Sequence, residues 1–182
     1  MTRALVIVDI QNDYFPGGAF PLVEPEAAAA NAAEVLGAFR AAGEPVVHIQ
    51  HVSADPEATF MRRGSHGDEI HELVAPAAGE IVLQKAHPNS FLGTHLESTL
   101  RDLGADEVVV LGMMSSMCVD ATVRAASDLG FDVTVVHDAC AAPDLEFGGT
   151  SIPGGAVHAA FMAALSDSYA TVVPAARLAQ TH

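Results

Sequence analysis

The stretch that decides the fold lies at the start of the chain and reads Arg3-Ala4-Leu5-Val6-Ile7-Val8-Asp9. Between its charged ends it is continuously apolar rather than alternating, which is typical of a strand buried on both faces of a parallel sheet. Further short runs rich in Val, Ile and Leu have the same character. We expect strands at residues 3–9, 45–51, 80–85, 107–111, 132–137 and 170–173.

Ala-rich stretches separate these runs and indicate helices. We expect them at residues 26–42, 93–103, 115–130 and 153–165. Gly43, Gly104 and Gly130 stand where a left-handed C-cap residue belongs. Strands that alternate with helices imply right-handed crossovers and a mostly parallel sheet covered on both sides. The sequence therefore predicts one α/β domain over residues 1–182.

Three longer stretches, residues 12–25, 52–68 and 141–151, are richer in Gly, Pro and polar residues than the rest. They are expected to be irregular loops, and loops of this length in a compact domain usually carry function.

Composition excludes several classes of protein. The chain has 8 Lys and Arg against 23 Asp and Glu, a net charge of −15, which argues against binding to nucleic acid or to an anionic membrane. Its apolar runs are too short to span a bilayer, and no signal-peptide pattern is present. Two cysteines make no disulfide framework. We expect a cytoplasmic protein whose cysteines act as thiols.

Reactive side chains follow the expected strands at their carboxyl ends, where open parallel sheets bind ligands. Asp9 follows the first strand, Lys85 closes the third and Cys118 follows the fourth. A helix N-terminus and the Lys85 ammonium are expected to lower the pKa of Cys118, and Asp9 could accept the thiol proton. The alternative is that Cys118 is a small buried hydrophobe.

Four motifs occur in order at these strand ends. They are residues 4–15, 85–91 (Lys-Ala-His-Pro-Asn-Ser-Phe), 112–122 (Gly-Met-Met-Ser-Ser-Met-Cys-Val-Asp-Ala-Thr) and 138–141. Together they resemble the isochorismatase-like cysteine hydrolase superfamily over nearly the whole chain, in a bacterial branch similar to streptothricin hydrolase and to nicotinamidase-related amidases. The resemblance implies a Rossmann-like, three-layer α/β/α fold with a six-stranded, mostly parallel sheet. It also implies a homo-oligomer, either a dimer or a tetramer.

The same resemblance implies a catalytic triad of Asp9, Lys85 and Cys118 that cleaves a C–N bond of a small amide or lactam without a cofactor. Asp9 would take the proton of Cys118, and the thiolate would attack the carbonyl to form a thioester. The backbone N–H groups of Met114 and Cys118 would hold the oxyanion. Family members carry a cis peptide bond at the position that matches Met113–Met114.

Several side chains near these motifs are candidates for substrate binding. They are Gln11, Tyr14, Phe60, Met113 and Met117. Two alternatives stay open: Gln11 could support Asp9 instead, and the methionines could be ordinary core residues.

Two further functions fit the same resemblance: hydrolysis of a vinyl ether, which needs an acid but no nucleophile, and a catalytically silent oligomeric binding protein. The nicotinamidase branch adds a metal held by an Asp-x-His pair near the second strand. His51 and Ser53 occupy those two places here, so no metal is expected. The sequence leaves open whether a metal assists near His51 and His71.

Overall fold

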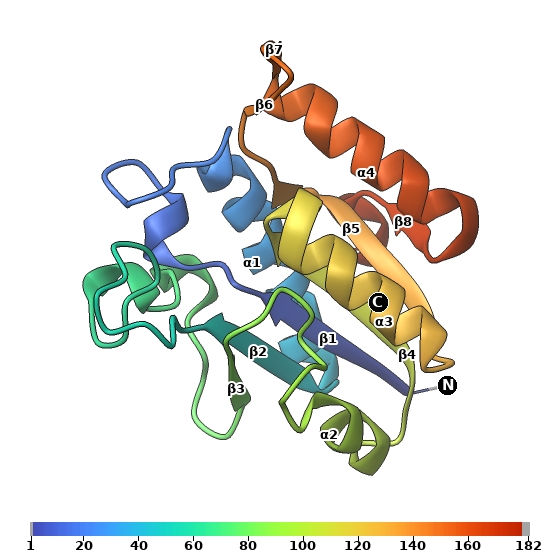
Figure 1. The fold of residues 1–182 in the computed structure, drawn as a ribbon. Helices are drawn as coiled ribbons and strands as arrows, with labels where there is room; N and C mark the ends of the chain where they lie inside the picture. The colour runs from blue at the N-terminus through green and yellow to red at the C-terminus, as the bar shows by residue number, and fades with distance from the viewer. Residues whose placement is uncertain (1, 180–182) are drawn as a thin grey trace.

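The computed structural model describes residues 2–179, so Met1 and residues 180–182 of the expected domain lie outside it. One sheet has six strands in the order β3-β2-β1-β4-β5-β8, and each neighbouring pair is parallel (Figure 1). Its strands are β1 (Thr2–Val8), β2 (Val46–His51), β3 (Ile81–Lys85), β4 (Ala105–Met113), β5 (Asp132–Ala141) and β8 (Thr171–Val173). The predicted six-stranded parallel sheet is confirmed.

Helices cover both faces of this sheet. They are α1 (Pro25–Ala42), α2 (Leu96–Asp102), α3 (Asp120–Asp128), α4 (Gly154–Ser168) and α5 (Ala175–Ala179). Helices α1 and α5 pack together on one face, and α3 and α4 pack together on the other (Figure 1). The three-layer α/β/α architecture is therefore also confirmed. No helix within residues 2–179 is long and apolar enough to cross a membrane.

The central strands are buried as predicted, whereas the edge strands β3 and β8 are not. In β1 the residues from Ala4 to Val8 are almost completely buried. Strand β3 alternates between partly buried and exposed positions, and Val82 is 41% exposed, because an edge strand has one open side. Continuous burial is thus a wrong expectation for residues 80–85 and also for residues 170–173, where Thr171 is exposed.

The segment at residues 141–151 is not an irregular loop, which corrects that prediction. Strands β6 (Leu145–Phe147) and β7 (Thr150–Ile152) form an antiparallel hairpin that projects beside α4 (Figure 1). Gly148 and Gly149 connect them, both with positive φ. A two-residue turn of this kind matches the twist of a hairpin but needs residues that tolerate positive φ.

A close approach of β4 to β1 shapes the edge where the site lies. Gly112 pairs with Val8 and has a φ of 134°, and a Cβ added to Gly112 would overlap the carbonyl of Val8. Only glycine fits this position. It brings the segment after β4 against the end of β1, where Asp9 follows.

The expected helices at residues 93–103 and 115–130 are both shorter in the structure. The first is limited to α2, and the second begins with a π-helical turn over Ser115–Val119 before α3. Short 3₁₀ turns lie in the loops that follow β1 and β2, over Asn12–Tyr14, His66–Asp68 and Glu72–Val74. Single π turns occur frequently at functional sites.

Candidate active site

Asp9 lies directly after β1, with a φ of 48° and a completely buried side chain. A left-handed backbone is uncommon for a residue other than glycine, and such conformations concentrate at functional sites. Its Oδ2 atom lies 2.6 Å from Nζ of Lys85, and both side chains are inaccessible to solvent. A buried carboxylate at this position is therefore compensated by a buried ammonium.

Lys85 ends β3, two strands away from β1, and reaches three acceptors. Besides Asp9, its Nζ atom donates to the carbonyl of His87 at 2.9 Å and lies 3.3 Å from Nδ1 of His51. An ammonium has three N–H donors and no lone pair, so the His51 Nδ1 atom must be the acceptor. The neutral ring of His51 then carries its proton on Nε2. Three acceptors from three segments hold the ammonium in one place.

Cys118 completes the cluster from the π-helical turn after β4. Ligand atoms of Asp9, His51 and Cys118 all lie within 4.8 Å of one another. The structure thus brings together the three residues of the predicted triad, from the ends of β1, β3 and β4. It adds His51, which the sequence suggested only as a metal ligand.

The pKa of Cys118 is raised to about 12, mainly by burial and further by the Asp9 carboxylate, while Lys85 lowers it. The expectation of a lowered pKa is wrong, because burial and the adjacent carboxylate outweigh the ammonium. Burial also raises the pKa of Asp9, against the opposing charge of Lys85. The resting sulfur is therefore a thiol, and Asp9 is the neighbouring base that can take its proton.

The same three side chains form a donor set of the kind that binds metal ions. The Lys85 ammonium, however, lies 2.6 Å from Asp9 and 3.3 Å from Nδ1 of His51. It supplies the positive charge at this place and occupies the lone pair of His51. His71 lies apart, stacked on Phe15 with ring centroids 3.8 Å apart. These residues do not fit a metal site.

Tyr14 lies near the triad, and Phe60 packs on Tyr14. Tyr14 is buried, which raises its pKa, and the charges of Cys118 and Asp9 add to this rise, so the phenol lies within electrostatic reach of both. The ring of Phe60 packs on Tyr14 at a centroid distance of 5.5 Å. The two loops that follow β1 and β2 therefore meet at these two rings.

Gln11 and Met113 are completely buried. The amide of Gln11 bonds the backbone N–H and C=O of His51 and donates to the carbonyl of Asp68. This side chain holds His51 in place, and its contact with a substrate stays a prediction. Met113 is part of the hydrophobic core, in agreement with the alternative interpretation, whereas Met117 is 49% exposed.

The turn that carries Cys118 is tied to its surroundings on several sides. The peptide bond between Met113 and Met114 is cis, as the resemblance implies. The Met114 carbonyl accepts hydrogen bonds from the N–H groups of Met117 and Val119. The Ser115 hydroxyl donates to the carbonyl of Ala141 at 3.1 Å and is bonded to Nδ1 of His158 at 2.8 Å. These bonds connect the turn to β5 and α4.

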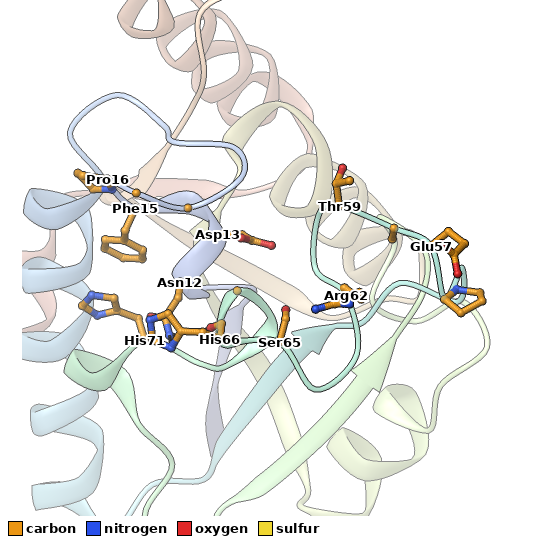
Figure 2. A pocket seen from close by; sticks show the side chains of 15 residues that line it. Asn12, Asp13, Phe15, Pro16, Glu57, Thr59, Arg62, Ser65, His66 and His71 are labelled. Carbon is orange, nitrogen blue, oxygen red and sulfur yellow. Dashed lines mark hydrogen bonds between the residues drawn. The ribbon is translucent and has the colours of Figure 1, made fainter.

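A cavity of about 810 Å³ opens between the loops that follow β1 and β2 (Figure 2). Asp13 ties these loops together, because its buried carboxylate accepts hydrogen bonds from the N–H groups of Ala19 and Met61. Asp13 lies in the motif at residues 4–15 but is not among the side chains predicted for the site. Side chains around the opening include Asn12, Phe15, Glu57, Thr59, Arg62, Ser65, His66 and His71.

Comparison with known proteins assigns the family. The profile of the isochorismatase domain matches residues 3–176. The chain belongs to the isochorismatase family. It is 50% identical over 172 residues to the isochorismatase family protein YddQ of Bacillus subtilis, which covers 94% of this chain and 96% of YddQ.

Two further relatives extend the comparison to a solved structure and to a named enzyme. A structure titled as an isochorismatase hydrolase from Oleispira antarctica superimposes with a TM-score of 0.95 at 48% identity, covering 98% of this chain and 96% of that one. Streptothricin hydrolase of Streptomyces noursei is 37% identical over 145 residues, 79% of this chain and 51% of the enzyme. The predicted family resemblance is confirmed.

Proposed function

We propose that this member of the isochorismatase family is a cysteine hydrolase that cleaves the C–N bond of a small amide or lactam. The observation that carries the proposal is the buried cluster in which Cys118 adjoins Asp9 and the Lys85 ammonium. Nucleophile, base and fixed cation lie together, as covalent catalysis requires. The similarity to streptothricin hydrolase supports a C–N bond as the target.

The first step is a proton transfer coupled to attack. The Cys118 thiol, with a pKa of about 12, gives its proton to Asp9 as the sulfur approaches the carbonyl carbon. Burial raises the pKa of Asp9 and so makes it a stronger base than an exposed carboxylate. The C–S bond forms, and the carbonyl electron pair moves to the oxygen, where the backbone N–H groups of Met114 and Cys118 stabilise it.

The second step releases the amine and then the acid. Protonated Asp9 returns its proton to the departing nitrogen, the C–N bond breaks, and a thioester remains on Cys118. A water molecule gives a proton to Asp9 and attacks the thioester; the C–S bond then breaks and Asp9 returns this proton to the sulfur, which leaves the carboxylic acid and the free thiol. Throughout, the Lys85 ammonium lies 2.6 Å from Asp9 and stabilises negative charge on the carboxylate and on the sulfur.

The test is direct detection of the acyl-enzyme. A panel of small amides and lactams is incubated with the protein, and intact mass spectrometry follows acylation while amine or ammonia release follows turnover. We expect a mass increase on Cys118 that hydroxylamine removes. Cys118→Ala should lose both acylation and turnover, and Cys140→Ala serves as the matched control.

The outcome for Cys118→Ala separates the alternatives. Turnover that survives this substitution would exclude covalent catalysis and favour a vinyl-ether hydrolase, in which Asp9 acts as an acid. Absence of acylation and turnover across the panel, together with an unreactive thiol, would favour a silent binding protein. The cytoplasmic location and the homo-oligomer stay predictions.

A further inference from the structure

His158 is the one ionisable side chain among residues 154–165 of helix α4, where Gly, Ala and other apolar residues supply the rest. Its ring is partly buried, and its Nδ1 atom lies 2.8 Å from the hydroxyl oxygen of Ser115, 43 positions earlier in the chain. The side chain of Ser115 has no exposed surface. Because a buried hydroxyl without hydrogen bonds costs free energy, this contact is a specific polar link between α4 and the turn after β4.

The direction of this hydrogen bond follows from the other partner of Ser115. The hydroxyl donates to the carbonyl of Ala141 at 3.1 Å, and a serine hydroxyl has one proton to donate. The ring of His158 must therefore donate through Nδ1–H. Burial lowers the pKa of His158 from its usual 6.5, and His137 adds to this effect, so the ring is neutral at pH 7 with its single proton on Nδ1. Helix α4, the turn and β5 are thus joined by two consecutive hydrogen bonds.

Ser115 stands between the two parts of the turn that the proposed reaction uses. It begins the π-helical turn Ser115–Val119, which carries Cys118, and it directly follows Met114, whose N–H is assigned to the oxyanion. The base and the cation of the site lie instead at the ends of β1 and β3. A shift of Ser115 would therefore move the thiol and the oxyanion donors together, away from the base and the cation.

We propose that His158 is a positioning residue for the nucleophile: through Ser115 it holds the Cys118 turn at reacting distance from the substrate carbonyl. The inference rests on the proposed hydrolase for the reaction that the turn serves, whereas the two hydrogen bonds of Ser115 do not depend on it. His158 acts on the site through Ser115 and not by contact with the reacting atoms.

His137 on β5 provides the matched comparison. Its ring centroid lies 6.4 Å from that of His158, and both residues line a cavity of about 300 Å³. In the part of the chain that the structure describes, no hydrogen bond joins the His137 ring to the turn. The two rings therefore share their surroundings, but only His158 bonds to Ser115. Because the cavity leaves room beside both rings, we expect variants at either position to fold.

Steady-state kinetics on an amide that the protein hydrolyses tests the role of the ring. His158→Leu should lower kcat about tenfold and change KM by less than about threefold, because a displaced turn slows the chemical step while the substrate-binding loops stay in place. His158→Asn should recover most of this loss, since its side-chain N–H can take the place of Nδ1–H. His137→Leu should keep kcat within about twofold. An unchanged kcat in His158→Leu, or an Asn variant no faster than the Leu variant, would overturn the inference.

A double-mutant cycle tests whether His158 acts through Ser115. The variant that combines Ser115→Ala with His158→Leu should lose no more kcat than Ser115→Ala alone, because both substitutions remove the same hydrogen bond. Ser115→Thr, which keeps the hydroxyl, should retain most of the activity. Losses that multiply in the double variant would contradict an action through Ser115. Denaturant unfolding of every variant checks that a lower kcat does not reflect a smaller fraction of folded protein.

Alkylation of Cys118 reports the same position without requiring turnover. The thiol is 5% exposed, so a loosened turn in His158→Leu should raise its rate of reaction with iodoacetamide at pH 8 about threefold or more, with no change in His137→Leu. If the unsubstituted protein hydrolyses no amide but alkylation changes in this way, the hydrolase is rejected and the positioning role of His158 stands. If amides are hydrolysed and His158→Leu leaves both kcat and alkylation unchanged, the hydrolase stands and this inference is rejected.

Discussion

The two cysteines of this chain are buried to a similar degree, but different groups surround them. Burial is the main cause that raises the pKa of each to about 12. Cys118 has Asp9 and the Lys85 ammonium beside it, whereas the Cys140 thiol in β5 donates to the carbonyl of Val136 at 3.3 Å. Burial therefore does not distinguish a nucleophile from a packing residue. The adjacent base and cation do.

Replacing each cysteine in turn should produce the largest difference in activity between the two positions. Cys118→Ala should lower kcat/KM by about 10⁴-fold or more, because the nucleophile is lost. Cys140→Ala should leave kcat/KM within about threefold and lower the free energy of unfolding by about 1–2 kcal/mol, since it removes only a buried sulfur. Amine release and denaturant unfolding measure the two effects. Comparable activity losses in both variants would contradict the assignment.

Asp9→Asn should separate reactivity from catalysis at Cys118. The Asp9 carboxylate raises the pKa of the thiol, so its loss should lower that pKa and speed alkylation of Cys118 by iodoacetamide at pH 8. Turnover should nevertheless fall by about 10²–10³-fold, because the base and later acid is absent. Peptide mass spectrometry reports both thiols, with Cys140 as internal reference. Slower alkylation in this variant would show that Asp9 activates the resting thiol instead.

Lys85→Met should act in the opposite direction on the same thiol. The ammonium lowers the pKa of Cys118, so its loss should slow alkylation about tenfold while Cys140 is unaffected. The free energy of unfolding should fall by about 3 kcal/mol, because Asp9 is left buried without its partner. Arg40→Met, which breaks the ion pair with Glu80, is a control for stability alone. Equal alkylation rates in both variants would remove Lys85 from the reactive cluster.

His51 should give the smallest effect, visible as a pH dependence of stability. Burial and the charge of Lys85 lower its pKa from 6.5 to about 4. Between these values the unfolded chain binds a proton that the folded chain does not, so stability should decrease as pH falls from 6.5 toward 4. The decrease is expected to be about 1–2 kcal/mol for this partly exposed ring.

His51→Asn should flatten that slope while the amide oxygen still accepts from Lys85. Denaturant unfolding at several pH values provides the measurement. An unchanged slope in the variant would assign the pH dependence to another group. By contrast with the cluster around Cys118, the surroundings of Cys140 include no histidine that contributes to the pKa of that thiol.

Much of the site could be predicted because the carboxyl ends of parallel strands meet at one edge of the sheet. Asp9, Lys85 and Cys118 each follow or end an apolar run, so their proximity follows from the fold class alone. The role of Gln11 could not be predicted this way. Its bonds to His51 and Asp68 depend on how two loops approach each other, and loop geometry leaves little trace in local patterns.

Arg62 and Asp13, which both line the cavity, likewise show what local sequence patterns could not predict. In the sequence, Arg62 and Arg63 are adjacent and indistinguishable. Only the folded loops show that Arg63 is bonded to Gln84 while Arg62 faces the cavity without a partner in the part of the chain that the structure describes. The π-helical turn before α3 was likewise hidden within a segment that reads as one continuous helix.

The sequence by itself determined the parallel sheet through hydrophobic periodicity, and the family and the three residues expected at the sheet edge through the motifs at residues 4–15, 85–91 and 112–122, because both kinds of signal depend on local residue types. The tertiary structure decided the chemical state of those residues. The pKa of Cys118 depends on burial and on the charges of two residues that are distant in the sequence. Asp9 precedes Cys118 by 109 residues and Lys85 precedes it by 33. Desolvation and Coulomb energies depend on distances in the folded chain, and those arise only from packing.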